Sequence, residues 1–147
     1  MSKVPTCVRR IQFCAGHRVM DHESKCQNMH GHNYVVFFHA RALWLDSIGR
    51  VIDFSVLKEK MGGWIDTYWD HGFIYYLEDD EMATMFGFEE GGHQKYKNFG
   101  LPYNPTAENM AKYLLEVTAS LQMEGTGVEV FKVVLWETEN CYAEAEL

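Results

Sequence analysis

Residues 26–45, with the sequence CQNMHGHNYVVFFHARALWL, decide how this chain folds. Their second part, residues 33–45, is rich in β-branched and aromatic side chains, which predicts a long strand. If His32 opens this strand, His30 and His32 project to the same face, because side chains alternate along a strand. Gly31 between them lets the backbone bend where it enters the strand. The segment therefore predicts a strand that begins with two imidazoles on one face.

A third histidine lies upstream, near the end of another predicted strand. Residues 8–19 alternate around Ile11, Phe13 and Ala15, and His17 has the same parity. Two histidines from one strand and a third from its neighbour form a ligand set typical of catalytic zinc, which keeps a fourth position open. Spacing alone leaves a metal site and three unrelated histidines as open alternatives. A cupin-like barrel is excluded, because apolar residues stand where its downstream glutamate would lie.

Three further places in the sequence carry side chains suited to chemistry. Cys26 lies in a polar, aperiodic loop, where a nearby divalent cation would favour its thiolate; burial as a small apolar side chain is the alternative. Asp70 and His71 form either a surface turn or a carboxylate–imidazole pair that moves protons. Glu137 follows an apolar run and could bind the N–H and NH₂ edge of a planar heterocycle. The cysteines expected only to pack in strands are Cys7, Cys14 and Cys141.

The rest of the chain predicts two amphipathic helices and two more long strands. The first helix begins at Asp53 or Ser55, and its apolar stripe ends at Tyr68. The second begins within residues 104–108 (NPTAE), and its buried stripe ends at Leu121. The other predicted elements are a short strand at 51–54, a long loop at 73–101 with one helix near 82–86, a turn at 137–140, and strands at 128–136 and 141–147. This order predicts an α+β fold, an antiparallel four-stranded sheet with two helices on one face, whose open edges favour oligomerisation.

Length and composition fit a single domain, 1–147, with a hydrophobic core. The net charge of −8 argues against a nucleic-acid partner, although a small anionic substrate can still bind beside a cation. No apolar run approaches membrane-spanning length, and the N-terminus lacks a signal-peptide core, so no membrane or secretory role is expected. Four irregularly spaced cysteines then predict reduced thiols and a cytoplasmic location.

Taken together, these residues give the chain a resemblance to a known family. It resembles the 6-pyruvoyl-tetrahydropterin synthase superfamily and, within it, the 6-carboxy-tetrahydropterin synthases of queuosine biosynthesis. The three-residue spacing between Cys26 and His30 is similar to that of the carboxy-tetrahydropterin enzymes. The ordered motifs that carry the resemblance are FCAGH at 13–17, CQNMHGHN at 26–33, VIDF at 51–54, DH at 70–71, PTAEN at 105–109 and ET at 137–138.

The resemblance implies a tunnelling fold (T-fold), in which small subunits join their sheets into an oligomeric barrel. The usual assembly is a homohexamer made of two trimers, with active sites between subunits. Residues 78–101 would be a family-variable insertion loop. The site residues implied by the resemblance are zinc ligands His17, His30 and His32, catalytic residues Cys26, Asp70 and His71, and substrate-binding residues Glu137, Thr106 and Glu108.

The function implied by the resemblance is that of a zinc-dependent lyase. It would convert 7,8-dihydroneopterin triphosphate to 6-carboxy-5,6,7,8-tetrahydropterin, acetaldehyde and triphosphate in queuosine and 7-deazaguanine biosynthesis. A 6-pyruvoyl-tetrahydropterin synthase and a dihydroneopterin aldolase-like activity are alternatives within the superfamily. A non-catalytic pterin- or zinc-binding protein is an alternative of another class. The residues that hold the triphosphate stay open among Lys25, Arg18 and Arg9.

Overall fold

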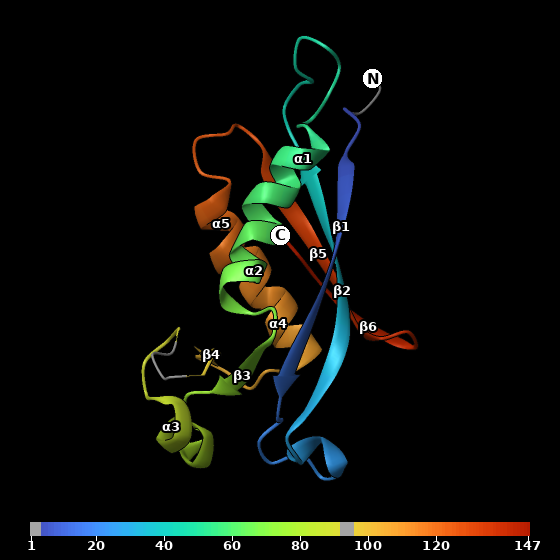
Figure 1. The fold of residues 1–147 in the computed structure, drawn as a ribbon. Coiled ribbons are helices and arrows are strands. Elements are labelled where there is room, and N and C mark those ends of the chain that lie inside the picture. Colours follow the sequence, from blue (N-terminus) through green and yellow to red (C-terminus); the bar gives the residue numbers. More distant parts are fainter. Residues whose placement is uncertain (1–3, 92–95) are drawn as a thin grey trace.

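Two long antiparallel strands, β1 (Cys7–His17) and β2 (His30–Arg41), form the centre of the sheet in the computed structural model (Figure 1). They pair along nearly their whole length, and His17 at the end of β1 lies opposite His30 at the start of β2. This pairing explains why β2 begins before the apolar run of the sequence. The ladder with β1 continues through the two histidines, so both belong to the strand.

Four further strands complete a curled mixed sheet in the order β4-β3-β1-β2-β5-β6. β5 pairs antiparallel with β2 and β6, whereas β3 runs parallel to β1, and β4 runs parallel to β3. Their bounds are β3 Gly72–Tyr76, β4 Asn98–Leu101, β5 Glu129–Thr138 and β6 Cys141–Glu146. The prediction of four antiparallel strands is therefore wrong, as is that of a loop at 73–76 and 98–101; residues 92–95 of the predicted loop lie outside the described residues. The short strands β3 and β4 are largely buried and show no alternation, so the sequence pattern did not reveal them.

Two helical segments cover one face of this sheet (Figure 1). The carboxylate of Asp53 caps the first segment by accepting a hydrogen bond from the Ser55 amide at 2.8 Å. This cap stands where the sequence predicted a short strand at 51–54, and that prediction is wrong. The first segment consists of α1 (Phe54–Leu57), the π-helical turn η2 (Lys58–Gly62) and α2 (Gly63–Tyr68). The second consists of α4 (Ala107–Tyr113), the π-helical turn η3 (Leu114–Thr118) and α5 (Ala119–Gln122).

The π-helical turns change which side chains the helices bury. Their hydrogen bonds join residues five apart instead of four, so each turn adds about one residue to the helical repeat. In the first segment Trp69 is fully buried, whereas the predicted Tyr68 is 43% exposed. In the second segment Thr118 is fully buried, whereas the predicted Leu121 is 63% exposed. The predicted stripes are therefore wrong at their C-terminal ends, beyond the π-helical turns.

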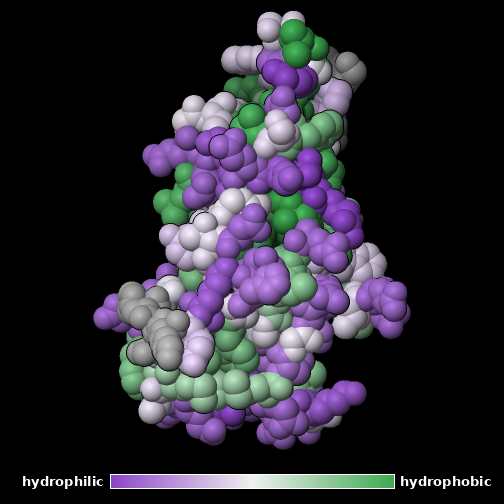
Figure 2. All heavy atoms as spheres, in the orientation of Figure 1, coloured by the Kyte–Doolittle hydropathy of each residue, from purple (hydrophilic) through white to green (hydrophobic). Residues whose placement is uncertain are grey.

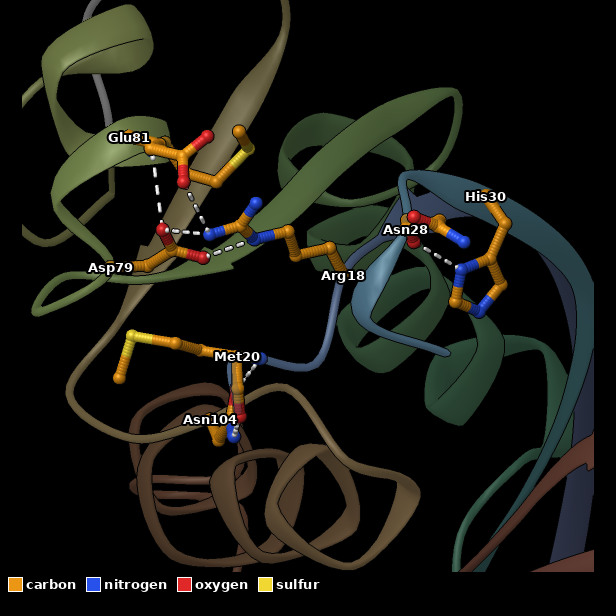
Figure 3. Close-up of polar contacts among 8 residues, drawn as sticks. Arg18, Met20, Asn28, His30, Asp79, Glu81 and Asn104 are labelled. Carbon is orange, nitrogen blue, oxygen red and sulfur yellow. Dashed lines mark hydrogen bonds and ion pairs between the residues drawn. The ribbon is translucent and has the colours of Figure 1, made fainter. Parts of the chain in front are cut away.

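A third helix, α3 (Asp80–Phe86), confirms the short helix expected near 82–86. It packs on β3 through a small second core made of Tyr75, Met82, Ala83 and Phe86. Asp79 joins α3 to the end of β1 (Figure 3). Arg18 donates hydrogen bonds to both carboxylate oxygens of Asp79, at 2.7 and 2.8 Å, and the same carboxylate caps α3. Because Asp79 is only 1% exposed, this is a buried ion pair.

The structure describes residues 4–91 and 96–147, and within them no helix is long and apolar enough to cross a membrane.

The surface carries a group of exposed apolar side chains at one end of the molecule. The loop between β2 and α1 projects from the sheet, and hydrophobic residues are exposed at that end (Figure 1, Figure 2). Leu43, Trp44 and Ile48 in this loop are 82%, 73% and 72% exposed. The sequence placed the first two in a strand, but β2 ends before them.

The buried ion pair of Arg18 and Asp79 makes the first testable prediction. The Arg18→Met variant leaves a buried carboxylate without its cation, so we expect the free energy of unfolding to fall by about 3 kcal/mol. The matched control is Arg50→Met, whose partners Asp46 and Asp53 are exposed; its loss should change the free energy of unfolding much less, because water screens the exposed charges. Urea unfolding of both variants at one protein concentration measures the difference. Equal losses would contradict the buried ion pair as the anchor of α3.

Candidate active site

Three imidazoles meet at the end of the sheet where β1 and β2 are joined. The register places His17 opposite His30 and Ala15 opposite His32, so all three histidines lie on the helix-covered face. The ring centroids are 4.6 to 5.1 Å apart, and one ligand atom from each ring lies within 4.8 Å of the others. The structure thus brings together the three residues predicted as metal ligands.

The hydrogen bonds around these rings leave nitrogen lone pairs facing one another. The Nδ1–H group of His17 donates to the carbonyl of Pro105 at 2.7 Å, and that of His30 donates to the carbonyl of Asn28 at 2.6 Å (Figure 3). With a proton on Nδ1 of each ring, the Nε2 atoms are left to bind another group, and they lie 3.1 Å apart. The Nε2 atom of His32 is buried and has no hydrogen-bond partner in the described structure. A bound cation satisfies all three atoms, so the residues fit a metal ion.

Burial keeps two of these imidazoles neutral at pH 7. It lowers the pKa of His17 to about 4, against the opposing hydrogen bond to Pro105; repulsion from His30 and His32 lowers it further. Burial also lowers the pKa of His32, although the nearby charge of Glu137 raises it in part. A neutral imidazole is the form that binds a metal, so no proton has to be removed from either ring at pH 7.

Glu137 lies beside His32 and lines a large cavity with it. Its Oε1 atom is 3.6 Å from the Nε2 atom of His32. The structure places Glu137 within β5 instead of the predicted turn, at an irregularity of the β5–β6 pairing between Trp136 and Thr138. The cavity has a volume of about 730 Å³, in the range of small-molecule sites. Its other walls are mainly Val35, Phe37, Trp136, Thr138 and Asn140. An apolar floor with a carboxylate at one end suits a planar heterocycle that has N–H donors.

Asp70 and His71 form a hydrogen-bonded pair in the turn between α2 and β3. The Nδ1 atom of His71 lies 2.9 Å from Oδ2 of Asp70, and the amide of Cys14 donates to Oδ1 at 2.9 Å. Burial raises the pKa of Asp70, but the Cys14 amide, His71 and the charge of Lys97 lower it by more. The net pKa is below the ordinary value, so this carboxylate is ionised at pH 7 and orients the imidazole.

Cys26 lies in a different loop from the Asp70–His71 pair. It is in the 3₁₀ turn η1 (Lys25–Gln27), and its carbonyl accepts a hydrogen bond from the Val19 amide at 2.9 Å. Among the residues that the structure describes, no hydrogen bond or ion pair joins Cys26 to Asp70 or His71. The thiol beside that pair is Cys14, which the sequence analysis assigned to packing alone; its Sγ atom lies 2.9 Å from Oδ1 of Asn33.

Asn104 holds the loop that carries Cys26, and its role was missed by the sequence analysis. Its side-chain amide exchanges two hydrogen bonds with the backbone of Met20, at 2.8 and 2.9 Å (Figure 3). A side chain that bridges 84 positions leaves no periodic signal, so only the helix-start pattern around Asn104 was visible in the sequence. These hydrogen bonds fix the loop between β1 and β2, which carries Cys26 shortly before the start of β2.

The predicted substrate-binding residues on the second helical segment lie in its first turn. The Oγ1 atom of Thr106 accepts a hydrogen bond from the Asn109 amide at 3.1 Å and so caps α4. Glu108, in the same turn, is exposed. Thr106 directly follows Pro105, the residue that orients His17. Arg18, a candidate for the triphosphate, instead pairs with Asp79.

Comparison with known proteins assigns the chain to a family. The model of the 6-pyruvoyl tetrahydropterin synthase family matches residues 6–147. The chain belongs to this family. Proteins named 6-carboxy-5,6,7,8-tetrahydropterin synthase from Rickettsia bellii and Aquifex aeolicus are 38% and 32% identical to it, over 94% and 92% of this chain and 97% and 94% of theirs. A solved structure of an uncharacterized protein from Wolinella succinogenes, 25% identical, has a TM-score of 0.81 and covers 99% of both chains.

The geometry of the three imidazoles predicts which histidines of this family member bind metal. We expect His30→Ala to lose the bound metal, because two nitrogens no longer hold a divalent cation against exchange with water. His39→Ala is the matched control, because His39 lies on β2 at odd parity, on the opposite face. Elemental analysis after gel filtration should find about one ion per chain in the control and almost none in His30→Ala. Metal retained in full by His30→Ala would contradict the assignment.

Proposed function

We propose that this member of the 6-pyruvoyl tetrahydropterin synthase family is a zinc-dependent 6-carboxytetrahydropterin synthase. It would convert 7,8-dihydroneopterin triphosphate to 6-carboxy-5,6,7,8-tetrahydropterin, acetaldehyde and triphosphate, in the pathway to queuosine. The observation that carries the proposal is the position of Glu137, which is 3.6 Å from His32 and lines the same cavity. A carboxylate suited to bind a heterocycle thus lies beside His32, one of the three histidines that could hold a metal ion. The names of the Rickettsia and Aquifex relatives support this activity within the family.

Glu137 would fix the orientation of the substrate. Its two carboxylate oxygens can accept hydrogen bonds from the N–H and 2-amino groups on one edge of a pterin. The apolar walls of the cavity, among them Val35, Phe37 and Trp136, would contact the faces of the ring system. A compound without the N–H and NH₂ edge would leave the Glu137 carboxylate unpaired, and the cavity should therefore reject it strongly.

Zinc held by His17, His30 and His32 would act as a Lewis acid on the hydroxyl groups of the substrate side chain. The thiolate of Cys26 would remove a proton from that side chain. The Asp70–His71 pair would return a proton elsewhere on the substrate, with Asp70 holding the imidazole by its Nδ1–H group. The ring gains the electrons that the side chain loses, so this internal redox change needs no nicotinamide.

We infer that Cys26 and the Asp70–His71 pair act together across two copies of the chain. Within one described chain, no hydrogen bond or ion pair joins them. The sheet ends in strands β4 and β6, and β6 alternates exposed and half-exposed residues along an open edge. Pairing of sheets from neighbouring copies, as in a hexameric T-fold barrel, would cover this edge and can complete the site.

The reaction itself is the test of the proposed function. Zinc-loaded protein incubated with 7,8-dihydroneopterin triphosphate should release 6-carboxy-5,6,7,8-tetrahydropterin and acetaldehyde, both detected by mass spectrometry. Protein stripped by a chelator should be inactive, and added zinc should restore turnover. A 6-pyruvoyl product would instead show the sister activity, and cleavage of the side chain without triphosphate release would show an aldolase. Pterin binding without any product would support a non-catalytic protein.

A cysteine variant separates proton transfer from metal binding. Cys26→Ala should keep its zinc but lose turnover by roughly 100-fold to 10,000-fold, the usual contribution of a general base. Ser24→Ala is the matched control, because Ser24 is exposed in the same loop and its side chain makes no capping hydrogen bond, so its turnover should not change. Full activity in Cys26→Ala would remove this thiol from the mechanism.

A further inference from the structure

The Asp70–His71 pair lies where the chain turns from α2 into β3, and this turn needs support. His71 has a φ angle of +62°, in the left-handed region that side chains with a Cβ atom rarely adopt. The amide of His71 donates to the carbonyl of Cys14, which fixes the turn against β1. The imidazole itself is 77% exposed, so packing does not hold the ring. The position of the ring therefore depends on the turn and on the Asp70 carboxylate.

Lys97 supports the same turn from the opposite side. Its Nζ group donates a hydrogen bond to the carbonyl of Asp66 at 2.7 Å, and a second, short one to the carbonyl of Asp70. These carbonyls belong to the end of the helical segment, where oxygens lack helical partners and a cation is favoured. A single ammonium group thus joins the last turn of the helix to the residue before His71.

The backbone and the aliphatic stem of Lys97 also make contacts with the start of β3. Its carbonyl accepts a hydrogen bond from the Phe73 amide at 3.1 Å, which starts the parallel ladder between β3 and β4. Its aliphatic stem passes over Gly72, where an added Cβ atom would lie only 3.2 Å from the Cγ atom of Lys97. Gly72 leaves room for the stem, so the close approach depends on the absence of a side chain there.

From these contacts we propose that Lys97 is a positioning residue for the Asp70–His71 pair, which deepens the proposed function and rests on it. Lys97 comes from the 78–101 segment, which the sequence analysis treated as a variable insertion. Its ammonium group holds the turn in one geometry and keeps a positive charge beside the Asp70 carboxylate. The ionised carboxylate in turn accepts the Nδ1–H group of His71, a residue that lines a cavity together with Cys14, Asn33 and His32.

The charged and titratable groups that face Asp70 make the effect of Lys97 measurable. They are the His71 imidazole in the same turn and the Lys97 ammonium group before β4; the backbone amide of Cys14 on β1 also donates to the carboxylate. Loss of the Lys97 charge removes one of the groups that favour the ionised carboxylate, so the pKa of Asp70 should rise. Since the ionised form is the one that orients His71, the acidic limb of the pH–rate profile should then move to higher pH.

The experiment compares Lys97→Met with Lys97→Arg, which keeps the charge, and with Lys58→Met. Lys58 is the matched control, because it is exposed on the same helical segment about 18 Å before Asp70 along the helix axis. We expect Lys97→Met to lower kcat by roughly tenfold to a hundredfold, with KM changed less than about twofold and zinc content unchanged. Lys97→Arg should recover most of the loss, and Lys58→Met should behave as the wild-type protein.

A titration without substrate separates this inference from the proposed function. Carboxyl ¹³C NMR of aspartate-labelled protein, with Asp70 assigned through Asp70→Asn, should show a higher pKa for Asp70 in Lys97→Met than in the wild type or Lys97→Arg. If the wild type makes no product, the proposed function fails and this titration still decides the role of Lys97. An unchanged Asp70 pKa overturns the inference. An equal loss of kcat, zinc content and thermal stability also overturns the inference, because that result would show a purely structural role for Lys97. If Lys97→Met does not fold, Lys97→Gln repeats the test.

Discussion

The register between β1 and β2 is the constraint on which the rest of the structure depends. His30 and His32 share their parity with Tyr34, Val36 and Phe38, which are all fully buried. A slip of one residue would turn these core side chains to the opposite face, together with the two imidazoles. Burial of each such side chain contributes roughly 1.5–3 kcal/mol, so the core determines the register and the histidines follow it. The position of the three histidines is thus a consequence of core packing.

The orientation of the imidazoles depends on the loops more than on the strands. Strand geometry brings the rings together, but the carbonyls of Asn28 and Pro105 select which nitrogen carries the proton. Pro105 occupies its place because Thr106 caps α4 directly after it, and Asn104 ties the same segment to the Cys26 loop. The start of α4 therefore affects the site in two ways. Pro105 orients the ring of His17, and Asn104 holds the loop that carries Cys26.

The parts of this structure that the sequence could predict are those with a local repeat. Alternation along β1 and β2 is enough to place His17, His30 and His32 on one face. The same method missed β3 and β4, which are buried too evenly to alternate, and it misplaced the helical stripes beyond each π-helical turn. Contacts such as Arg18 with Asp79 join residues 61 positions apart, and such pairs leave no periodic pattern in a single sequence.

The three histidines and the Asp70–His71 pair are built by different packing units that share β1. The histidines continue the faces of β1 and β2 over the main core, whereas β3 also packs on α3 through a smaller second core. The left-handed backbone at His71 costs on the order of 1–3 kcal/mol and persists because β1, β3 and the residue before β4 all contact the turn. Changes within the second core can therefore act on the Asp70–His71 pair without moving the three histidines. Because Cys14 and His17 are three residues apart on one strand, the distance between the two groups is nevertheless fixed by the strand itself.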